Sequence, residues 1–364
     1  MKGVNFDLPL AKCYSLDRSM SMNLAETALA ESAKPRLCAL FPGALGDFIC
    51  FLPALHSLAR SYAVDLLARS EFAAIAPPAV RVLSLERYEI RQLFMTDGVG
   101  DERVRQFFEL YNAVYSWFAS QQSLFVEQLQ EVAPGRAQLF PFRSETFTGH
   151  QADFYLACVA AQSPDEPEPL VSLRPEALHW RDDFYRANGC AGVPRLIVAP
   201  GSGAREKNWP EENFLEIAQW WRAQLGGQVV VVLGPVERER RGVERLSGAG
   251  IVAGDLDLAQ LAALLAGGDL CLGNDSGVSH LAAAVGSRTV ALFGPSDERQ
   301  WAPRGPRVTV LRRAIAGSPC DDPAMERAAD HPCLSGLTPA EVIHELRKLP
   351  EIANLTRLGV GITV

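Results

Sequence analysis

The fold is decided by the stretch LCLGNDSGVSHLAAAVG, residues 270–286. It starts as an apolar strand, breaks at the turn 273–277 and continues at once as a helix of small residues. A strand, a tight turn and a helix start place several backbone N–H groups and the positive end of a helix dipole at one point, which suits a phosphate or diphosphate. Asn-Asp-Ser-Gly is also an ordinary helix N-cap, so this stretch alone supports both interpretations.

Side chains of the same turn could contact such a ligand. Asp275, Ser276 and Gly277 lie in the turn itself. His280 follows Ser276 by four residues, about one helical turn, so both side chains can face the ligand.

Alternating strands and helices surround this stretch. Strands are expected at 196–201, 228–234, 250–254, 269–273 and 289–294, with helices at 211–225, 237–247, 258–267 and 277–286. An earlier series has strands at 36–41, 64–68, 80–85, 113–117 and 137–141, with helices at 48–60, 104–111, 122–132 and 151–161. This alternation is typical of parallel sheets covered by helices on both faces.

A stretch rich in proline and acidic residues, 163–169, separates the two series. We therefore predict an α/β chain with two Rossmann-like, doubly wound domains. The expected segments are a mobile extension (1–35), a first domain (36–165), a linker (166–193), a second domain (194–338), and a C-terminal helix and tail (339–364).

Composition limits the class of protein. The length of 364 residues favours two domains. The net charge of −8 argues against general nucleic-acid binding. No apolar run approaches the length of a membrane span, and the first residues lack the continuous apolar core of a signal peptide. Eight scattered cysteines indicate a reducing compartment, so we expect a cytoplasmic protein.

A second turn, PGALGD at residues 42–47, joins the first strand to a helix. Gly43 and Gly46 let the backbone turn sharply. The turn is neither a P-loop nor the Gly-x-Gly-x-x-Gly fingerprint. Asp47 lies at the carboxyl end of the strand, where open α/β sheets bind ligands. It is either a capping carboxylate or a general base that deprotonates a hydroxyl.

A third turn, APGSGAREKNWP at residues 199–210, begins the second series. Gly201 and Gly203 allow close approach of the backbone, Ser202 offers a hydroxyl, and Lys207 offers a point charge for phosphate oxygens. The alternative interpretation is a flexible loop with a solvated lysine.

Three weaker features remain. Glu237, at the end of the next strand, is either a ribose-binding carboxylate or a solvated one. Asp255 and Asp257 have metal-motif spacing but directly precede a helix, so capping explains them better. A sparse set without an obvious fourth metal ligand comprises Cys320, His331 and Cys333. We predict no metal site.

Three sequence blocks follow one another along the chain in this order: PGALGDFICFLPALHSLAR, PGSGAREKNWPEENFLEIA and LCLGNDSGVSHLAAAVGSRTVALFGPSDERQWAP. Together they closely resemble glycosyltransferase family 9, the ADP-heptose:lipopolysaccharide heptosyltransferases and their relatives. The resemblance covers roughly residues 36–348 and is most specific in the third block. It implies the GT-B architecture, in which two Rossmann-like domains face each other across a cleft. The first domain then holds mainly the acceptor, and the second holds the nucleotide-sugar.

The resemblance also implies an inverting, metal-independent transfer. Asp47 matches the family's catalytic base. The residues that match or neighbour donor contacts are Gly46, Gly201, Ser202, Lys207, Glu237, Asp275, Ser276, Gly277 and His280. No cofactor is implied, because the nucleoside-diphosphate sugar, ADP-linked in the best-known members, is a substrate.

The acceptor is less well specified. The resemblance implies a cell-envelope glycan or glycolipid such as the lipopolysaccharide core, and it leaves open a peripheral contact with the inner membrane. However, the arginines of the first half are dispersed in the sequence rather than clustered. Two alternatives therefore stay open: a noncatalytic nucleotide-sugar-binding or scaffold protein, and a nucleotide-sugar epimerase of the same architecture.

Overall fold

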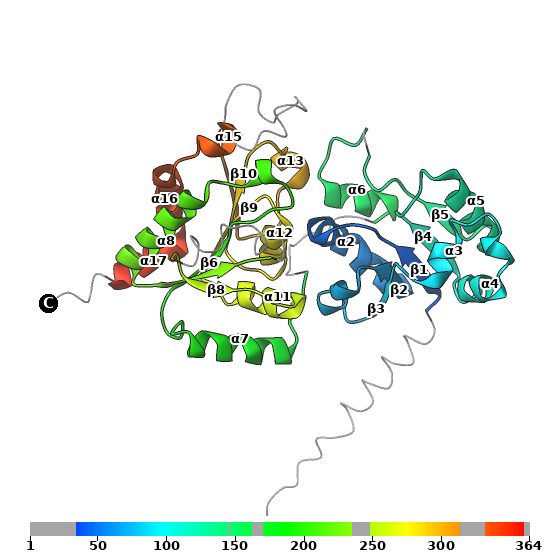
Figure 1. Cartoon of the computed structure of the whole chain (residues 1–364), viewed down its shortest axis with the longest axis horizontal. Coiled ribbons are helices and arrows are strands. Elements are labelled where there is room, and N and C mark those ends of the chain that lie inside the picture. Colours follow the sequence, from blue (N-terminus) through cyan, green and yellow to red (C-terminus); the bar gives the residue numbers. More distant parts are fainter. Residues whose placement is uncertain (1–33, 145, 162–169, 235–247, 314–331, 360–364) are drawn as a thin grey trace, which may run out of the picture.

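The computed structural model describes residues 34–144, 146–161, 170–234, 248–313 and 332–359. Most of the predicted extension, the helix expected at 237–247, and the candidates Glu237, Cys320 and His331 lie outside the described residues. The described chain forms two halves that lie side by side (Figure 1).

The first half is built on a five-stranded parallel sheet of order β3-β2-β1-β4-β5. Its strands are β1 (Arg36–Leu40), β2 (Ala63–Ala68), β3 (Val80–Ser84), β4 (Ala113–Ser116) and β5 (Ala137–Leu139). All five were predicted within a few residues. The sheet forms because these runs are short and apolar and alternate with helices.

Alternate residues of β1 belong to different cores, because successive side chains of a strand point to opposite faces. Leu37 and Ala39 pack with α2 (Leu45–Ser61) and α6 (Gln151–Cys158). Cys38 and Leu40 pack on the other face, with α3 (Tyr88–Gln92), α4 (Glu102–Glu109) and α5 (Ser123–Val132). The sheet is therefore doubly wound.

The second half has a six-stranded parallel sheet of order β11-β10-β9-β6-β7-β8. The strands are β6 (Arg195–Ala199), β7 (Gln228–Val232), β8 (Ile251–Ala253), β9 (Leu270–Asn274), β10 (Thr289–Phe293) and β11 (Val308–Arg312). One face packs against α11 (Leu258–Ala266) and α12 (Gly277–Ala284). The other packs against α8 (Glu211–Leu225), α16 (Pro339–Lys348) and α17 (Pro350–Gly359). The predicted α/β class is confirmed.

The segment predicted as a linker contains a helix, α7 (Pro175–Ala187). It packs on α11, and the Tyr185 hydroxyl donates to the Leu264 carbonyl at 2.7 Å. The preceding proline-rich stretch hid this helix in the sequence. The predicted C-terminal helix is α16, which packs on α8. The domain limits themselves stay a prediction.

The two halves share an apolar core where α2 packs against α12 (Figure 1). Gly277 allows this close contact, since a β-carbon there would lie 2.8 Å from the Leu45 Cβ and 2.9 Å from the Gly46 nitrogen. The first turns of both helices therefore meet almost backbone to backbone. We call this contact of Gly277 with Leu45 and Gly46 the floor between the halves.

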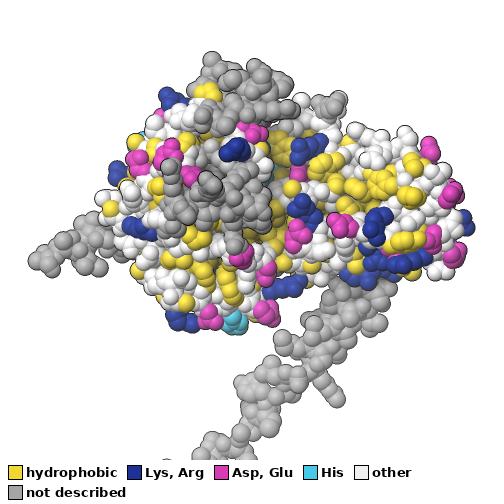
Figure 2. Space-filling model, viewed as in Figure 1, with side chains coloured by type: hydrophobic (Ala, Val, Ile, Leu, Met, Phe, Trp, Pro, Cys, Tyr) yellow, Lys and Arg dark blue, Asp and Glu magenta, His cyan; other side chains and the backbone are white. Residues whose placement is uncertain are grey.

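Some arginines that are dispersed in the sequence come together in the first half. Arg36 and Arg81 both bind the buried Asp65 carboxylate, at 2.8 and 2.6 Å. The Glu89 carboxylate likewise forms ion pairs with Arg87 and Arg103. Figure 2 shows Lys and Arg side chains gathered at the lower edge of this half. None of these paired arginines lines the cleft described below.

Candidate functional site

A cleft of about 780 Å³ lies between the two halves. Its walls come from the first turn of α2 and residue 143 on one side, and from the turns after β6, β9 and β10 on the other. The lining residues are Ala44, Gly46, Asp47, Arg143, Gly203, Ala204, Lys207, Asp275, Ser276, Gly277, His280, Pro295, Ser296, Asp297, Arg299, Gln300 and Trp301. The site therefore lies at the carboxyl ends of strands from both sheets, where doubly wound folds bind ligands.

Asp47 enters the cleft from the third position of α2. Its Oδ2 accepts a hydrogen bond from the Ala44 N–H at 3.2 Å, so the carboxylate caps its own helix. Its Oδ1 accepts one from the Arg143 Nη2 at 3.1 Å. The side chain is 11% exposed. The two sequence interpretations are therefore compatible: Asp47 caps α2 and also faces the cleft.

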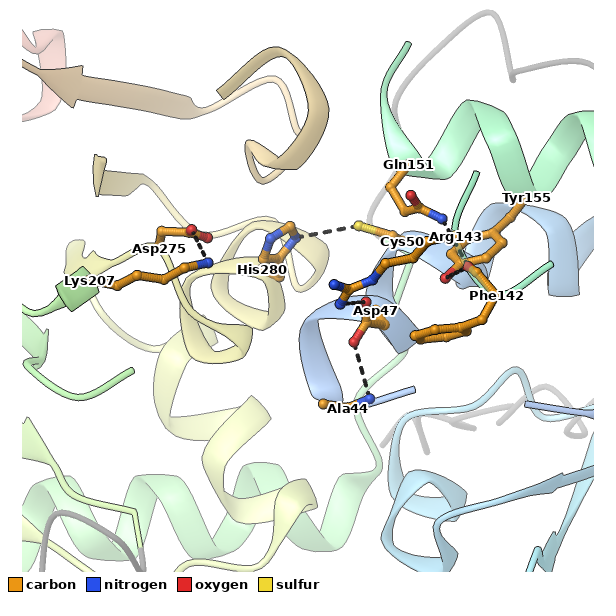
Figure 3. A network of polar contacts seen from close by, with 10 residues as sticks. All are labelled: Ala44, Asp47, Cys50, Phe142, Arg143, Gln151, Tyr155, Lys207, Asp275 and His280. Carbon is orange, nitrogen blue, oxygen red and sulfur yellow. Dashed lines mark hydrogen bonds and ion pairs between the residues drawn. The ribbon is translucent and has the colours of Figure 1, made fainter. Parts of the chain in front are cut away.

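Arg143 was not predicted. It lies four residues beyond the end of β5, and its side chain contacts Asp47 on the same wall of the cleft (Figure 3). Its guanidinium stacks on the Phe142 ring at 5.5 Å and on the Trp301 ring at 4.8 Å. Because Trp301 belongs to the second half, Arg143 links both halves above Asp47. Its only signal in the sequence is a position just after a strand.

The turn after β9 is fixed by the buried Asn274 amide. Its Oδ1 accepts from the Trp209 N–H at 3.0 Å, and its Nδ2 donates to the Pro200 carbonyl at 2.6 Å. These bonds join the turn 273–277 to the turn 199–210. The structure thus brings together two of the three turns that the sequence singled out.

Lys207 and Asp275 meet as a result. The Lys207 Nζ donates to the Asp275 Oδ2 at 2.8 Å, with the carboxylate 7% exposed and the lysine one third exposed. Both side chains line the cleft (Figure 3). A cation is therefore held at a fixed position next to the start of α12.

Ser276 is the N-cap residue of α12, yet its hydroxyl makes no capping bond. Within the described part of the chain, the buried Ser276 Oγ has no hydrogen-bond partner. Buried hydroxyls without partners are rare, and this one borders the cleft beside the N–H groups of the first turn of α12. The serine and the helix end together can bind an anion.

His280 lies deeper, against the other half. Its Nδ1 is 3.9 Å from the Cys50 Sγ on α2 (Figure 3). Burial lowers the pKa of His280, although Asp275 and Asp47 act in the opposite direction, so the imidazole stays neutral. Burial likewise raises the pKa of the Cys50 thiol to about 12. This pair is an uncharged contact between the halves.

Other predicted site residues are placed differently. The Ser202 hydroxyl is buried and donates to the Ala204 carbonyl at 2.5 Å, and neither Ser202 nor Gly201 lines the cleft. Their neighbours Gly203 and Ala204 do. Contact between Ser202 and a ligand therefore stays a prediction.

The possible metal motifs have structural uses or lie outside the description. Asp257 caps α11 by accepting from the Gln260 N–H at 2.8 Å. Cys333 is buried in the short helix α15 (Pro332–Ser335). Across the described ranges, no group of three or more His, Cys, Asp or Glu side chains is arranged to hold a metal ion.

Part of the chain is similar to one known family of proteins. The model of glycosyltransferase family 9 (heptosyltransferase) matches residues 154–327. Lipopolysaccharide heptosyltransferase 1 of Pseudomonas aeruginosa is 36% identical over 114 residues, which are 30% of this chain and 32% of that one. The chain spans between 32% and 62% of the length of the first curated relatives.

Solved structures extend the similarity to the fold. The structure of Escherichia coli ADP-heptose lipopolysaccharide heptosyltransferase II covers 90% of this chain and 100% of its own, with a TM-score of 0.65 and 20% identity. The iron-containing glycosyltransferase TibC of enterotoxigenic E. coli covers 89% of this chain and 77% of its own, with a TM-score of 0.55 and 14% identity. The predicted GT-B architecture is confirmed.

Proposed function

We propose that the protein transfers a sugar from a nucleoside-diphosphate sugar to a hydroxyl of a cell-envelope glycan, and the match of residues 154–327 to the model of glycosyltransferase family 9 supports this. One observation carries the proposal: a carboxylate, a lysine and a helix start with an unpartnered serine line one cleft. The family description supports heptose as the sugar. A curated relative named as a lipopolysaccharide core heptosyltransferase supports that core as the acceptor, and a structural neighbour named as an ADP-heptose heptosyltransferase supports ADP as the nucleotide.

The second half would bind the diphosphate. Lys207 supplies a positive charge, while Ser276 and the N–H groups at the start of α12 supply hydrogen-bond donors. When the bond between the sugar and the diphosphate breaks, its electron pair leaves with the phosphate oxygen. Lysine and a helix end stabilise that developing charge.

The first half would activate the acceptor. Asp47 takes the proton of the attacking hydroxyl while the acceptor oxygen forms its bond to the anomeric carbon. Asp47 and the groups that stabilise the leaving diphosphate come from opposite walls of the cleft. Attack from one side with departure on the other inverts the configuration at the anomeric carbon, so this arrangement supports an inverting transfer.

We further propose that no divalent metal takes part, because Lys207 and α12 offer the positive charge that a metal supplies elsewhere. The six described cysteines are free thiols, which supports a reducing, cytoplasmic location. Within the described residues, no helix is both long and apolar enough to cross a membrane. A peripheral contact with the inner membrane would bring the enzyme to a glycolipid acceptor.

The donor site is tested by thermal shift with ADP, UDP, GDP and CDP, each with and without EDTA. We expect stabilisation by one diphosphate, most simply ADP, that is insensitive to EDTA. Lys207→Ala should weaken it, whereas Lys348→Ala, which removes a surface lysine paired with Glu345, should not. Failure of every nucleotide to stabilise the protein would refute the donor site.

The reaction is tested with ADP-heptose and heptose-deficient lipopolysaccharide. We expect multiple turnovers of transfer with inverted configuration, and a loss of at least about 100-fold in Asp47→Asn. Undiminished transfer by this variant would refute the assignment of Asp47. Nucleotide binding without transfer would favour the scaffold alternative, and a changed sugar without acceptor would favour the epimerase.

A further inference from the structure

Residues 301–304 of the second half make three contacts with residues 143–153 of the first half. The Trp301 ring stacks on the Arg143 guanidinium at 4.8 Å. The Ala302 carbonyl accepts a hydrogen bond from the His150 Nε2 at 2.8 Å. The third contact is an ion pair between Arg304 and Asp153.

Arg304 and Asp153 form a two-bond ion pair. The Arg304 Nη1 and Nη2 donate to the two Asp153 oxygens at 2.6 and 2.5 Å. This forked arrangement is the strong form of an arginine–carboxylate contact. Both side chains remain almost half exposed, at 45% and 39%, so water can replace the contact. The pair is specific and also reversible.

These contacts lie on a different side of the cleft from the packing of α2 on α12. Residues 301–304 are the last residue of α13 (Glu298–Trp301) and the three that follow it, and α13 faces α6 across the gap between the halves (Figure 1). Gly46 and Gly277 meet at the floor. Neither Arg304 nor Asp153 lines the cleft. The Arg304–Asp153 ion pair and the stack of the Trp301 ring on Arg143 are therefore separate from the contact between Gly46 and Gly277.

Arg143 connects these contacts to Asp47. One Asp47 oxygen is fixed by the Ala44 N–H, and the other is held by Arg143. The guanidinium is itself 58% exposed and is fixed by its stack on Trp301. If Trp301 withdraws with the second half, Arg143 keeps only its stack on the Phe142 ring and is held less firmly against Asp47.

We propose that residues 301–304 are an inter-domain latch that holds Arg143 against Asp47, so that closure of the two halves sets the orientation of the proposed general base. Arg143 is then a positioning residue that acts through Asp47. The catalytic consequence rests on the proposed function, whereas the latch itself does not. A base that is out of place when the halves part would also spare the activated sugar from attack by water.

The test compares Arg304→Gln with a matched control, Arg307→Gln. Arg304 lies outside any helix, so its replacement opens the latch without unfolding a helix. Arg307 lies three residues away and pairs with Glu351 inside the second half, where Arg288 remains as a partner after its loss. Trp301→Leu, Arg143→Gln and Arg143→Lys complete the set.

The first readout needs no activity. Water-soluble carbodiimide with an amine nucleophile labels accessible carboxyl groups, and peptide mass spectrometry reports the labelling of Asp47. We expect labelling to rise about threefold or more in Arg304→Gln and Trp301→Leu, with no change in Arg307→Gln. Small-angle scattering should show a larger radius of gyration for Arg304→Gln than for the wild type, and no such increase for Arg307→Gln.

The second readout is turnover. We expect kcat to fall about tenfold in Arg304→Gln with little change in nucleotide affinity, since misplacement of a reacting group lowers the rate of the chemical step. Arg143→Lys should recover part of the kcat that Arg143→Gln loses. If Arg304→Gln matches Arg307→Gln in both labelling and kcat, or if labelling rises with kcat unchanged, the proposal is overturned. If the wild type transfers no sugar, the proposed function fails, and the labelling alone decides the latch.

Discussion

His150 makes the contact between the halves sensitive to acid. It caps α6, where its Nδ1 accepts from the Ala152 N–H at 3.1 Å, while its Nε2 donates to the Ala302 carbonyl. Only the neutral imidazole can do both, because a protonated Nδ1 would meet an N–H group. Burial, together with nearby Arg304 and His280, lowers the pKa of His150 to about 4, although the bond to Ala302 acts in the opposite direction.

The magnitude follows from proton linkage. Below about pH 6.5 the unfolded chain protonates His150, whereas the folded protein does so only near pH 4. The free energy of unfolding is therefore highest above pH 6.5, falls between pH 6.5 and 4, and falls no further below that range on account of this group. Between about pH 7.5 and about pH 5 the loss amounts to about 2 kcal/mol.

The variant His150→Asn removes this titration while retaining an N-cap acceptor for the Ala152 N–H. We expect its free energy of unfolding at neutral pH to be about 1 kcal/mol lower, since the bond to Ala302 is lost. On acidification to about pH 5 it should lose about 2 kcal/mol less than the wild type. Urea unfolding followed by tryptophan fluorescence at both pH values measures this. Burial lowers the pKa of His280 in both proteins, so its own contribution to the acid loss largely cancels in the difference. Equal acid losses would refute the reasoning.

Three further substitutions test the framework. Gly277→Ala places a β-carbon against the first turn of α2 and should lower the free energy of unfolding by about 1–3 kcal/mol, whereas Gly203→Ala, which meets nothing within 4 Å, should not; calorimetry compares them. Asp65→Asn should lower the free energy of unfolding, measured in urea, by about 2 kcal/mol, because it disrupts a buried ion pair. The exposed control Asp183→Asn should lower it by less than about 0.5 kcal/mol. Asp257→Ala should cost about 1 kcal/mol as a lost cap, equally with and without added Mn²⁺; a difference between those conditions would contradict capping.

The sequence was informative wherever function depends on strand ends. Each of the turns after β1, β6 and β9 is a local pattern, and the carboxyl ends of parallel strands share an edge of their sheet. For this reason Lys207, Asp275 and His280 could be expected near one site before any contact between them was visible. Asp47 follows a strand of the other sheet, so its place opposite them was implied only by the family resemblance; all four line the cleft.

The sequence was uninformative where function depends on distant pairs. His150 and Ala302 are 152 residues apart, and Arg304 and Asp153 are 151 apart, so neither pair leaves a periodic trace. Short or half-exposed elements were also missed. The strand β11 has no fully buried residue, and α3 spans only five residues, so the apolar periodicity that marks an element is weak in both.

The ion pair of Lys207 with Asp275 has a consequence for selectivity among anions. A small anion that approaches the lysine must compete with a buried carboxylate held 2.8 Å away. Inorganic phosphate has only one phosphate group with which to replace Asp275 at Lys207. A diphosphate can engage the lysine with one phosphate and the start of α12 with the other, so the second contact offsets the cost of separating the pair. The carboxylate thus acts as an internal competitor, and millimolar phosphate or sulfate should inhibit only weakly.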